Sequence, residues 1–172
     1  YSIDLPIISD TYTLTNSYRY RYFTELFENN ISSISLSLKS AHSLKDEDIK
    51  LSERLRIPSS SLRGFEYGKV GPKDGDDFIG GNYLSSINFT STIPQILENS
   101  QNTDFVFFID VASIWGVDYD SALDDNKIKS SIGIGLDWFS PAGPMTFSVA
   151  YPISKSSNDV TESFRFNLGT TF

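Results

Sequence analysis

Cysteine is absent from this sequence of 172 residues, and histidine occurs only once. Without cysteine, the chain can form no disulfide framework, no thiolate metal site and no cysteine nucleophile. The single histidine, His42, has no companions for a zinc site or a catalytic triad, and we expect it to be exposed. No phosphate-binding glycine loop is present either. We therefore expect no cofactor and no metal ion.

Basic residues are also few: 14 lysines and arginines stand against 22 aspartates and glutamates, for a net charge of -8. A protein that neutralises nucleic-acid phosphates needs a basic face, and here the basic residues are scattered, which excludes nucleic acid as a partner. Two acidic clusters lack the glutamate that closes an EF-hand loop. We expect them to be solvated surface loops: Asp74, Asp76 and Asp77, and Asp118, Asp120, Asp124 and Asp125.

Long hydrophobic runs are missing as well. No stretch reaches the length of about 18 apolar residues that a membrane-spanning helix needs. The chain does not begin with a basic segment that leads into an apolar one, as a signal peptide would. We expect that Tyr1 is not the natural start, and that the sequence is a fragment or is trimmed at its amino terminus.

The sequence does contain a regular alternation of apolar and polar residues. It is clearest from residue 128 to 138, with the period of two that a strand with one apolar face requires. Helical periodicity is scarce, because the one candidate stretch, residues 44–56, is short and highly charged. Residues 42–80 are expected to form a long loop. The alternation predicts about seven strands, at residues 12–27, 31–41, 82–93, 104–115, 128–138, 145–151 and 162–172.

Two all-β architectures fit this alternation. In a soluble sandwich the apolar face packs against a second sheet, whereas in an outer-membrane barrel it contacts lipid and the polar face encloses a wet lumen. The predicted strands are long for a sandwich, since globular strands average about 5 to 6 residues. Aromatic residues also gather near strand ends, where their rings suit a membrane interface, as at Trp115, Trp138, Phe139 and Tyr151. These features favour the transmembrane barrel.

Several short motifs recur in one order along the chain. They are Leu62-Arg63-Gly64-Phe65, Val70-Gly71-Pro72-Lys73, Gly80-Gly81-Asn82, Phe108-Ile109-Asp110, Gly133-Ile134-Gly135 with Trp138, Ser140-Pro141-Ala142-Gly143-Pro144, and Phe164-Arg165-Phe166-Asn167-Leu168-Gly169. In this order and spacing the sequence resembles the bacterial surface antigen family, to which the BamA-type assembly factors of the outer membrane belong. The resemblance covers about residues 55–172, and residues 1–54 match more loosely.

The resemblance implies a sixteen-stranded transmembrane barrel of the bacterial outer membrane, preceded by periplasmic POTRA domains. Residues 1–172 then form the carboxy-terminal part of the barrel, without the POTRA domains and the first strands. Seven strands cannot close such a barrel, and an open edge in lipid leaves backbone groups unpaired at a cost of several kcal/mol each. The implied function is assembly of outer-membrane proteins without enzymatic chemistry, and the implied partners are lipid, unfolded clients and accessory lipoproteins.

The resemblance also implies a site in the lumen. Within the loop motif of Leu62, Arg63, Gly64 and Phe65, the arginine is expected to reach an acidic residue of the inner wall, and Asp110 stands at the matching position. The alternation agrees independently, because it places Asp110 opposite Phe107 and Ile109 and hence inward. A second acidic wall position aligns with the uncharged Asn88, which is expected to weaken this network. Asp137, also inward by alternation, is expected to compensate.

The last strand is the other implied site. It is expected to form one side of a lateral gate, through which client strands add by β-augmentation, and its residues are Phe164, Phe166, Leu168, Gly169 and Phe172. Glycine 169 would weaken pairing near the end of the strand because it has no side chain to pack. Two alternatives remain open from sequence: a secretion transporter of the same superfamily, and a soluble sandwich that binds a ligand, such as a lectin module.

Overall fold

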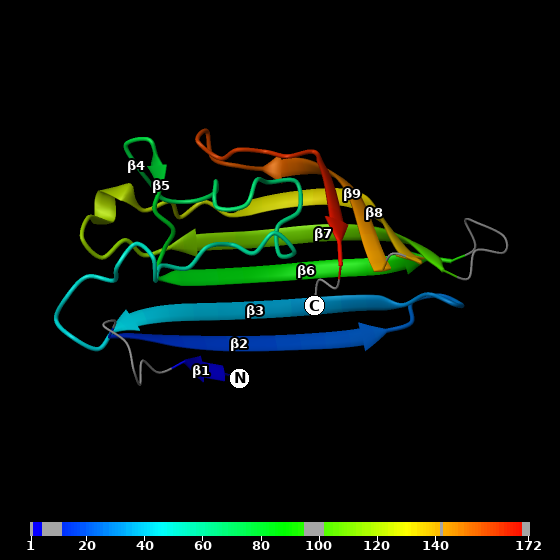
Figure 1. The fold of residues 1–172 in the computed structure, drawn as a ribbon, viewed down its shortest axis with the longest axis horizontal. Coiled ribbons are helices and arrows are strands. Elements are labelled where there is room, and N and C mark those ends of the chain that lie inside the picture. Colours follow the sequence, from blue (N-terminus) through cyan, green and yellow to red (C-terminus); the bar gives the residue numbers. More distant parts are fainter. Residues whose placement is uncertain (1, 5–11, 95–101, 142, 170–172) are drawn as a thin grey trace.

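A computed structural model describes residues 2–4, 12–94, 102–141 and 143–169 of the chain. These residues form one antiparallel sheet of eight strands in the order β1-β2-β3-β6-β7-β8-β9-β10 (Figure 1). Its strands are β1 (Ser2–Asp4), β2 (Thr13–Thr24), β3 (Ser32–Ser43), β6 (Tyr83–Ile93), β7 (Thr103–Trp115), β8 (Lys129–Ser140), β9 (Gly143–Ser154) and β10 (Phe164–Leu168). Each strand pairs with its neighbours in sequence, apart from the small hairpin in the loop between β3 and β6.

The seven predicted strands are confirmed with differences at their ends; of the last, expected at residues 162–172, the strand spans Phe164–Leu168, and residues 170–172 lie outside the described residues. The structure adds β1 and, in a separate hairpin, β4 (Lys73–Asp74) and β5 (Asp77–Phe78). These strands of two or three residues are too short to produce an alternation in the sequence. A single turn of 3-10 helix, η1, spans Ser121–Leu123, and the described part of the chain contains no helix long and apolar enough to cross a membrane.

The strand register gathers apolar side chains on the outer face of the sheet. One row runs across six adjacent strands through Tyr22, Ile34, Phe89, Ile109, Ile132 and Tyr151. Neighbouring positions on this face are open to the surroundings, and the side chain of Ile134 is 58% exposed and that of Tyr151 72%. No second sheet faces them within the described ranges. An apolar surface of this extent fits contact with hydrocarbon, so the soluble sandwich expected as one alternative is wrong.

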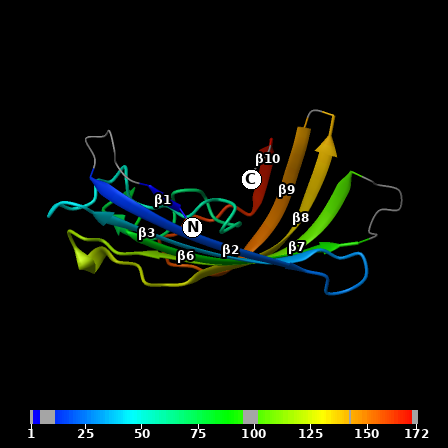
Figure 2. The same cartoon turned by 90° about the horizontal axis from the view of Figure 1, so that it is seen from below.

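The inner face is covered by the loop of residues 44–82. Figure 2 shows the sheet strongly curved, with this loop on its concave side. Ile57, Leu62, Phe65 and Val70 of the loop pack against the inward side chains of β6 and β7, which are Leu84, Ala112 and Ile114. The core of the molecule therefore lies between one sheet and one loop, inside the curve of an unclosed barrel wall.

The connections at the two ends of the sheet differ in length. Residues 25–31 make a short turn between β2 and β3 at one end, whereas residues 44–82, 116–128 and 155–163 make longer loops at the other. In outer-membrane barrels the short turns face the periplasm and the long loops face the exterior. By this rule β10 runs from the outer side toward the periplasm, and the long inward loop enters the lumen from outside.

A charge on the outer face should be much more costly than the same charge in the lumen. In a lipid-embedded barrel that contains this chain, Ile134→Lys should lower the free energy of unfolding by about 2–4 kcal/mol, because it places an ammonium group near mid-membrane. Thr90→Lys, on the inward face of β6, is the matched control and should cost less. Urea unfolding in vesicles measures both changes, and equal costs would contradict the assignment of the two faces.

Candidate functional site

Arg63, at the tip of the long loop, is bound to the inner wall by a two-pronged ion pair with Asp110 of β7. Its Nε donates to Asp110 Oδ2 at 2.7 Å, and its Nη2 donates to Asp110 Oδ1 at 2.7 Å. The backbone N–H of Arg63 donates to the same carboxylate at 3.0 Å. The Asp110 side chain is fully buried, and that of Arg63 is 20% exposed. Charge-assisted bonds of this fork geometry are short and strong.

An aromatic ring completes the surroundings of the guanidinium group. The Arg63 Cζ atom lies 3.5 Å from the centre of the Phe108 ring, which is itself fully buried. A cation over an aromatic face is attracted by the ring quadrupole, and more strongly where water is excluded. The Phe108 ring thus packs against the guanidinium group of Arg63, and Asp110 binds the same group through hydrogen bonds.

Asn88 contributes to this network as a donor. Its Nδ2 donates to Asp110 Oδ1 at 2.8 Å and to the backbone carbonyl of Ser61 at 2.9 Å. Asp110 therefore accepts four hydrogen bonds, three from Arg63 and one from Asn88. Asn88, expected to weaken the network because it is uncharged, takes part in it as a donor both to the buried carboxylate and to the loop.

Asp137, expected to compensate for the missing acid, lies outside the hydrogen bonds that join Arg63 and Asn88 to Asp110. It faces inward, as the alternation predicted, and lines the same cavity as Arg63. However, its carboxylate accepts a hydrogen bond from the Thr146 hydroxyl at 2.9 Å. Asn88 already supplies the fourth hydrogen bond to Asp110, so the network is complete without Asp137.

Small residues on the wall let the loop tip approach closely. Gly64 has φ +90°, and a Cβ atom there would lie 3.0 Å from Ala150 Cβ and 3.4 Å from Ser131 Cβ. The Ser131 hydroxyl donates to the carbonyl of Arg63 at 2.5 Å. On β8, a Cβ at Gly133 would lie 2.4 Å from the Phe108 ring. Glycine, serine and alanine on β8 and β9 therefore make the space in which the loop tip and its aromatic support fit.

Leu62 and Phe65, on either side of Arg63 and Gly64, fix the loop through apolar burial. Each is 2% exposed and belongs to the core between loop and sheet. Burying a side chain of this size stabilises by about 1.5–3 kcal/mol. In this motif Arg63 forms the ion pair and Gly64 allows the close backbone approach. Leu62 and Phe65 are the two apolar anchors.

The terminal strand β10 has one paired edge. It pairs with β9 over five residues, from Phe164 opposite Val149 to Leu168 opposite Met145. Its other edge has no strand partner among the described residues. Phe164, Phe166 and Leu168 face outward and are largely exposed, and Gly169 has φ +108° just beyond the strand. Phe172, the remaining residue of the predicted gate strand, lies outside the described residues.

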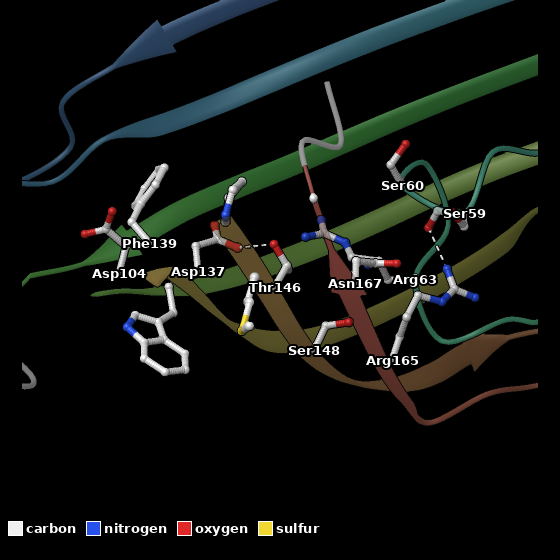
Figure 3. A pocket seen from close by; sticks show the side chains of 14 residues that line it. Ser59, Ser60, Arg63, Asp104, Asp137, Phe139, Thr146, Ser148, Arg165 and Asn167 are labelled. Atoms are coloured by element: carbon white, nitrogen blue, oxygen red, sulfur yellow. Dashed lines mark hydrogen bonds between the residues drawn. The ribbon is translucent and has the colours of Figure 1, made fainter. Parts of the chain in front are cut away.

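A cavity of about 470 Å³ separates the loop tip from the terminal strands. Figure 3 shows Arg63 and Ser59 on the loop side, Asp137 and Thr146 on β8 and β9, and Arg165 reaching across from β10. Its lining mixes both charge signs with apolar side chains such as Met145 and Trp138. The cavity thus lies on the inner side of the sheet, has a mixed polar and apolar lining, and is bounded on one side by β10.

The sequence matches the Omp85 superfamily domain over residues 6–172. The chain belongs to the Omp85 superfamily. This assignment agrees with the resemblance found in the sequence motifs, and it confirms the antiparallel outer-membrane barrel as the fold class.

Individual relatives align with most of this Omp85 chain. The outer-membrane protein assembly factor BamA of Neisseria meningitidis is 31% identical over an alignment of 140 residues that covers 65% of this chain and 18% of the relative. A SAM50-like protein of Schizosaccharomyces pombe is 29% identical over 159 residues, 84% of this chain and 33% of the relative. The crystal structure of Haemophilus ducreyi BamA lacking POTRA domains 1-3 matches with TM-score 0.82 and 25% identity, covering 91% of this chain and 35% of that one.

The Omp85 chain therefore spans less than a fifth of the length of the Neisseria BamA and about a third of the SAM50-like protein. It is similar to the carboxy-terminal barrel portion of BamA, as the motifs implied. The same relatives confirm the predicted location in the bacterial outer membrane.

Several residues of the site were missed from sequence. Phe108, Ser131, Gly133 and Ala150 are inward positions of predicted strands, so their face was known but their contacts with the loop were not. Arg165 stands within one of the sequence motifs, but no expectation was attached to it, although it binds the loop. The signal that could have found it is an arginine at an inward position of a strand whose other inward neighbours are small or uncharged.

At the outer end of the sheet, ion pairs bind the loops to one another. The buried Lys129 donates to Asp125 at 2.7 Å, and Asp125 also accepts from the Ser156 hydroxyl at 2.7 Å. Arg54, also buried, pairs with Asp118. These aspartates lie in surface loops, as expected, but Asp118 and Asp125 also pair with buried cations. Arg54 is 64 residues from Asp118, so the sequence does not indicate that they meet. Lys129 is close to Asp125 in sequence, but nothing distinguishes this pair from other neighbouring charges.

The charge state of Asp125 should make this end of the molecule sensitive to acid. Partial burial raises its pKa, but hydrogen bonds from Lys129, Ser156 and the Lys127 amide outweigh burial and hold the pKa below its ordinary value of 3.8. A lowered pKa stabilises the folded state above the ordinary value, and this contribution is lost as the pH falls through the folded pKa.

We therefore expect residues 116–128 to resist proteolysis from neutral pH down to about pH 4 and to become cleavable below it. Limited proteolysis at pH 7 and at pH 3, with a protease that is active at both, measures the change. Asp125→Asn, which removes the titrating group, should be cleaved more easily at pH 7. Its cleavage rates at pH 7 and at pH 3 should differ less than those of the wild type. A wild-type profile identical at both values would contradict the assigned role of Asp125.

Gly64→Ala should loosen the loop tip. The positive φ costs a residue with a Cβ about 1–2 kcal/mol, and the new methyl group would press on Ala150. The measurement is protease cleavage of residues 44–82 in the membrane-embedded parent protein. Ala150→Gly, added as a second change, relieves the contact but not the backbone strain and should rescue part of the protection. Full protection in Gly64→Ala alone would rule out the close approach as a constraint.

Proposed function

We propose that this chain is part of an outer-membrane protein assembly factor, which folds and inserts β-barrel clients through a lateral gate formed partly by its last strand. The observation that carries the proposal is the edge of β10. Within the described residues this strand pairs with β9 over five residues, and its second edge has no strand partner there. The BamA relatives, named as assembly factors of the outer membrane, support the proposal.

The free edge would act by β-augmentation. A strand edge presents a row of N–H and C=O groups, which in hydrocarbon cost several kcal/mol each when unpaired. A client strand that pairs with this edge satisfies those groups and enters the membrane already bonded to a partner. The chemistry is therefore hydrogen bonding and burial, so the protein acts without a cofactor and is not an enzyme.

In this proposal residues 1–172 are the carboxy-terminal part of the barrel domain. The first strands and the POTRA domains belong to the remainder of the parent protein, and the POTRA domains receive unfolded clients in the periplasm. The partners are outer-membrane lipid, unfolded outer-membrane proteins and accessory assembly lipoproteins. The likeness to a BamA crystal structure, of which this chain covers 35%, supports this arrangement.

The lumen loop would keep the wall next to the gate in one arrangement. Removing Arg63 leaves the buried Asp110 without its cation, and breaking a buried pair in this way costs about 3–5 kcal/mol. Arg63→Ala in the full-length parent should therefore release the loop and impair client assembly. Arg63→Lys keeps the charge but loses the two-pronged geometry, and it should retain part of the activity.

The experiment is folding of an unfolded outer-membrane protein into liposomes that contain the full-length parent, scored by the client's protection from protease. Arg19→Ala, which removes an exposed arginine on β2 away from the loop, is the matched control and should leave the rate unchanged. If Arg63→Ala retains both wild-type loop protection and wild-type client folding, the proposed tether is wrong. If the parent exports one soluble partner and folds no barrel client, the secretion transporter is the correct alternative.

A further inference from the structure

Arg165 of β10 binds the lumen loop on both sides of Arg63. Its Nη1 donates to the backbone carbonyl of Ser59 at 3.0 Å, and its Nη2 donates to the carbonyl of Phe65 at 2.6 Å. Figure 3 shows this guanidinium group reaching from the terminal strand to the loop. The side chain is 12% exposed, so water competes little for its donors. Arg165 thus bridges two carbonyl groups on either side of Arg63 in the loop.

Glu162, three residues before Arg165, fixes the direction of this guanidinium group. Its Oε2 accepts from Arg165 Nε at 2.9 Å and from Nη2 at 2.5 Å. Alone, such a half-exposed pair would contribute little, about 0–1 kcal/mol. The contacts to the loop are of another kind, because they join residues 100 and 106 positions apart in the sequence. The fork of an arginine can span two carbonyl groups in this way, whereas an ammonium group cannot hold the same geometry.

Backbone hydrogen bonds continue the contact beside Arg165. Glu162 N–H donates to the Gly64 carbonyl at 3.0 Å, and Glu66 N–H donates to the Val160 carbonyl at 3.0 Å. Phe65 lies opposite Thr161 in an antiparallel bridge. The loop is therefore paired, strand to strand, with the segment that leads into β10. In contrast, the far end of β10 is bonded only to β9 within the described part of the chain.

We propose that Arg165 is a positioning residue that couples the lumen loop to the gate strand and sets the point about which that strand opens. Arg165 keeps the loop turn in the shape that lets Arg63 reach Asp110, and the same contact clamps the beginning of β10. The strand then separates from β9 first at its Gly169 end. This inference rests on the proposed gate for its functional meaning, but the coupling itself concerns contacts that exist without a client.

Amide hydrogen exchange in the full-length parent, held in nanodiscs without clients, tests the coupling. In the wild type, the Gly169 amide, bonded to the Pro144 carbonyl, should exchange faster than the Glu162 amide. In Arg165→Ala, exchange should rise about tenfold or more at Glu66 and Glu162, since hydrogen bonds from a charged group are the stronger kind. The Arg63 amide, which donates to Asp110, should also exchange faster.

Two variants make the result specific to Arg165. Asn167→Ala is the matched control: Asn167 lies on the same strand and lines the same cavity, but no hydrogen bond joins its side chain to the loop in the described residues. It should leave exchange at Glu66, Glu162 and Arg63 unchanged. Arg165→Lys should give an intermediate increase, because the charge remains and the fork is lost. Glu162→Gln, a mild change, should raise exchange at the same amides by a smaller factor.

The coupling is overturned if Arg165→Ala leaves these amides unchanged, or if Asn167→Ala affects them equally. The hinge is overturned if Gly169 exchanges no faster than Glu162 in the wild type. Client folding by the same preparations is measured separately. A parent that folds no client, yet shows the predicted exchange pattern, would refute the proposed function while leaving the coupling intact.

Discussion

The buried carboxylate of Asp110 is the constraint on which the rest of this structure depends. A charge inside a protein is costly unless it is paired and hydrogen-bonded, and Asp110 accepts four hydrogen bonds from Arg63 and Asn88. Three of them come from a loop residue 47 positions away in sequence. The wall is therefore satisfied only when the loop is folded into the lumen, which makes the inward conformation of the loop a requirement of the sheet itself.

The close contact between loop and wall is possible because the two faces of the sheet differ in size as well as in polarity. Outward positions carry large apolar residues that suit hydrocarbon, whereas the inward positions of β8 and β9 include Ser131, Gly133 and Ala150. The missing volume on the inside is filled by the Phe108 ring and the backbone of Gly64. The same alternation thus produces a surface for lipid on one side and a fitted seat for the loop on the other.

The loop then joins two parts of the wall with different stability. Toward β7 it is bound by a buried ion pair and an apolar core, and toward β10 by backbone pairing and the fork of Arg165. β10 is the strand with a free edge and few ladder bonds, and elements with few contacts open most easily. In the proposed coupling, a change at β10 reaches the ion pair in the lumen through the loop that both parts of the wall bind.

The sequence by itself determined the strands, their faces and the inward position of Asp110, because a period of two assigns each side chain to one face whatever the partner strand is. The motif of residues 62–65 further indicated where the loop would be bound. Only the tertiary structure decided that Asn88 donates to Asp110 while Asp137 binds Thr146, and that Asp125 and Asp118 pair with buried cations. It also decided the part played by Arg165, since which polar groups meet depends on how the long loop crosses the sheet, and alternation carries no information about that path.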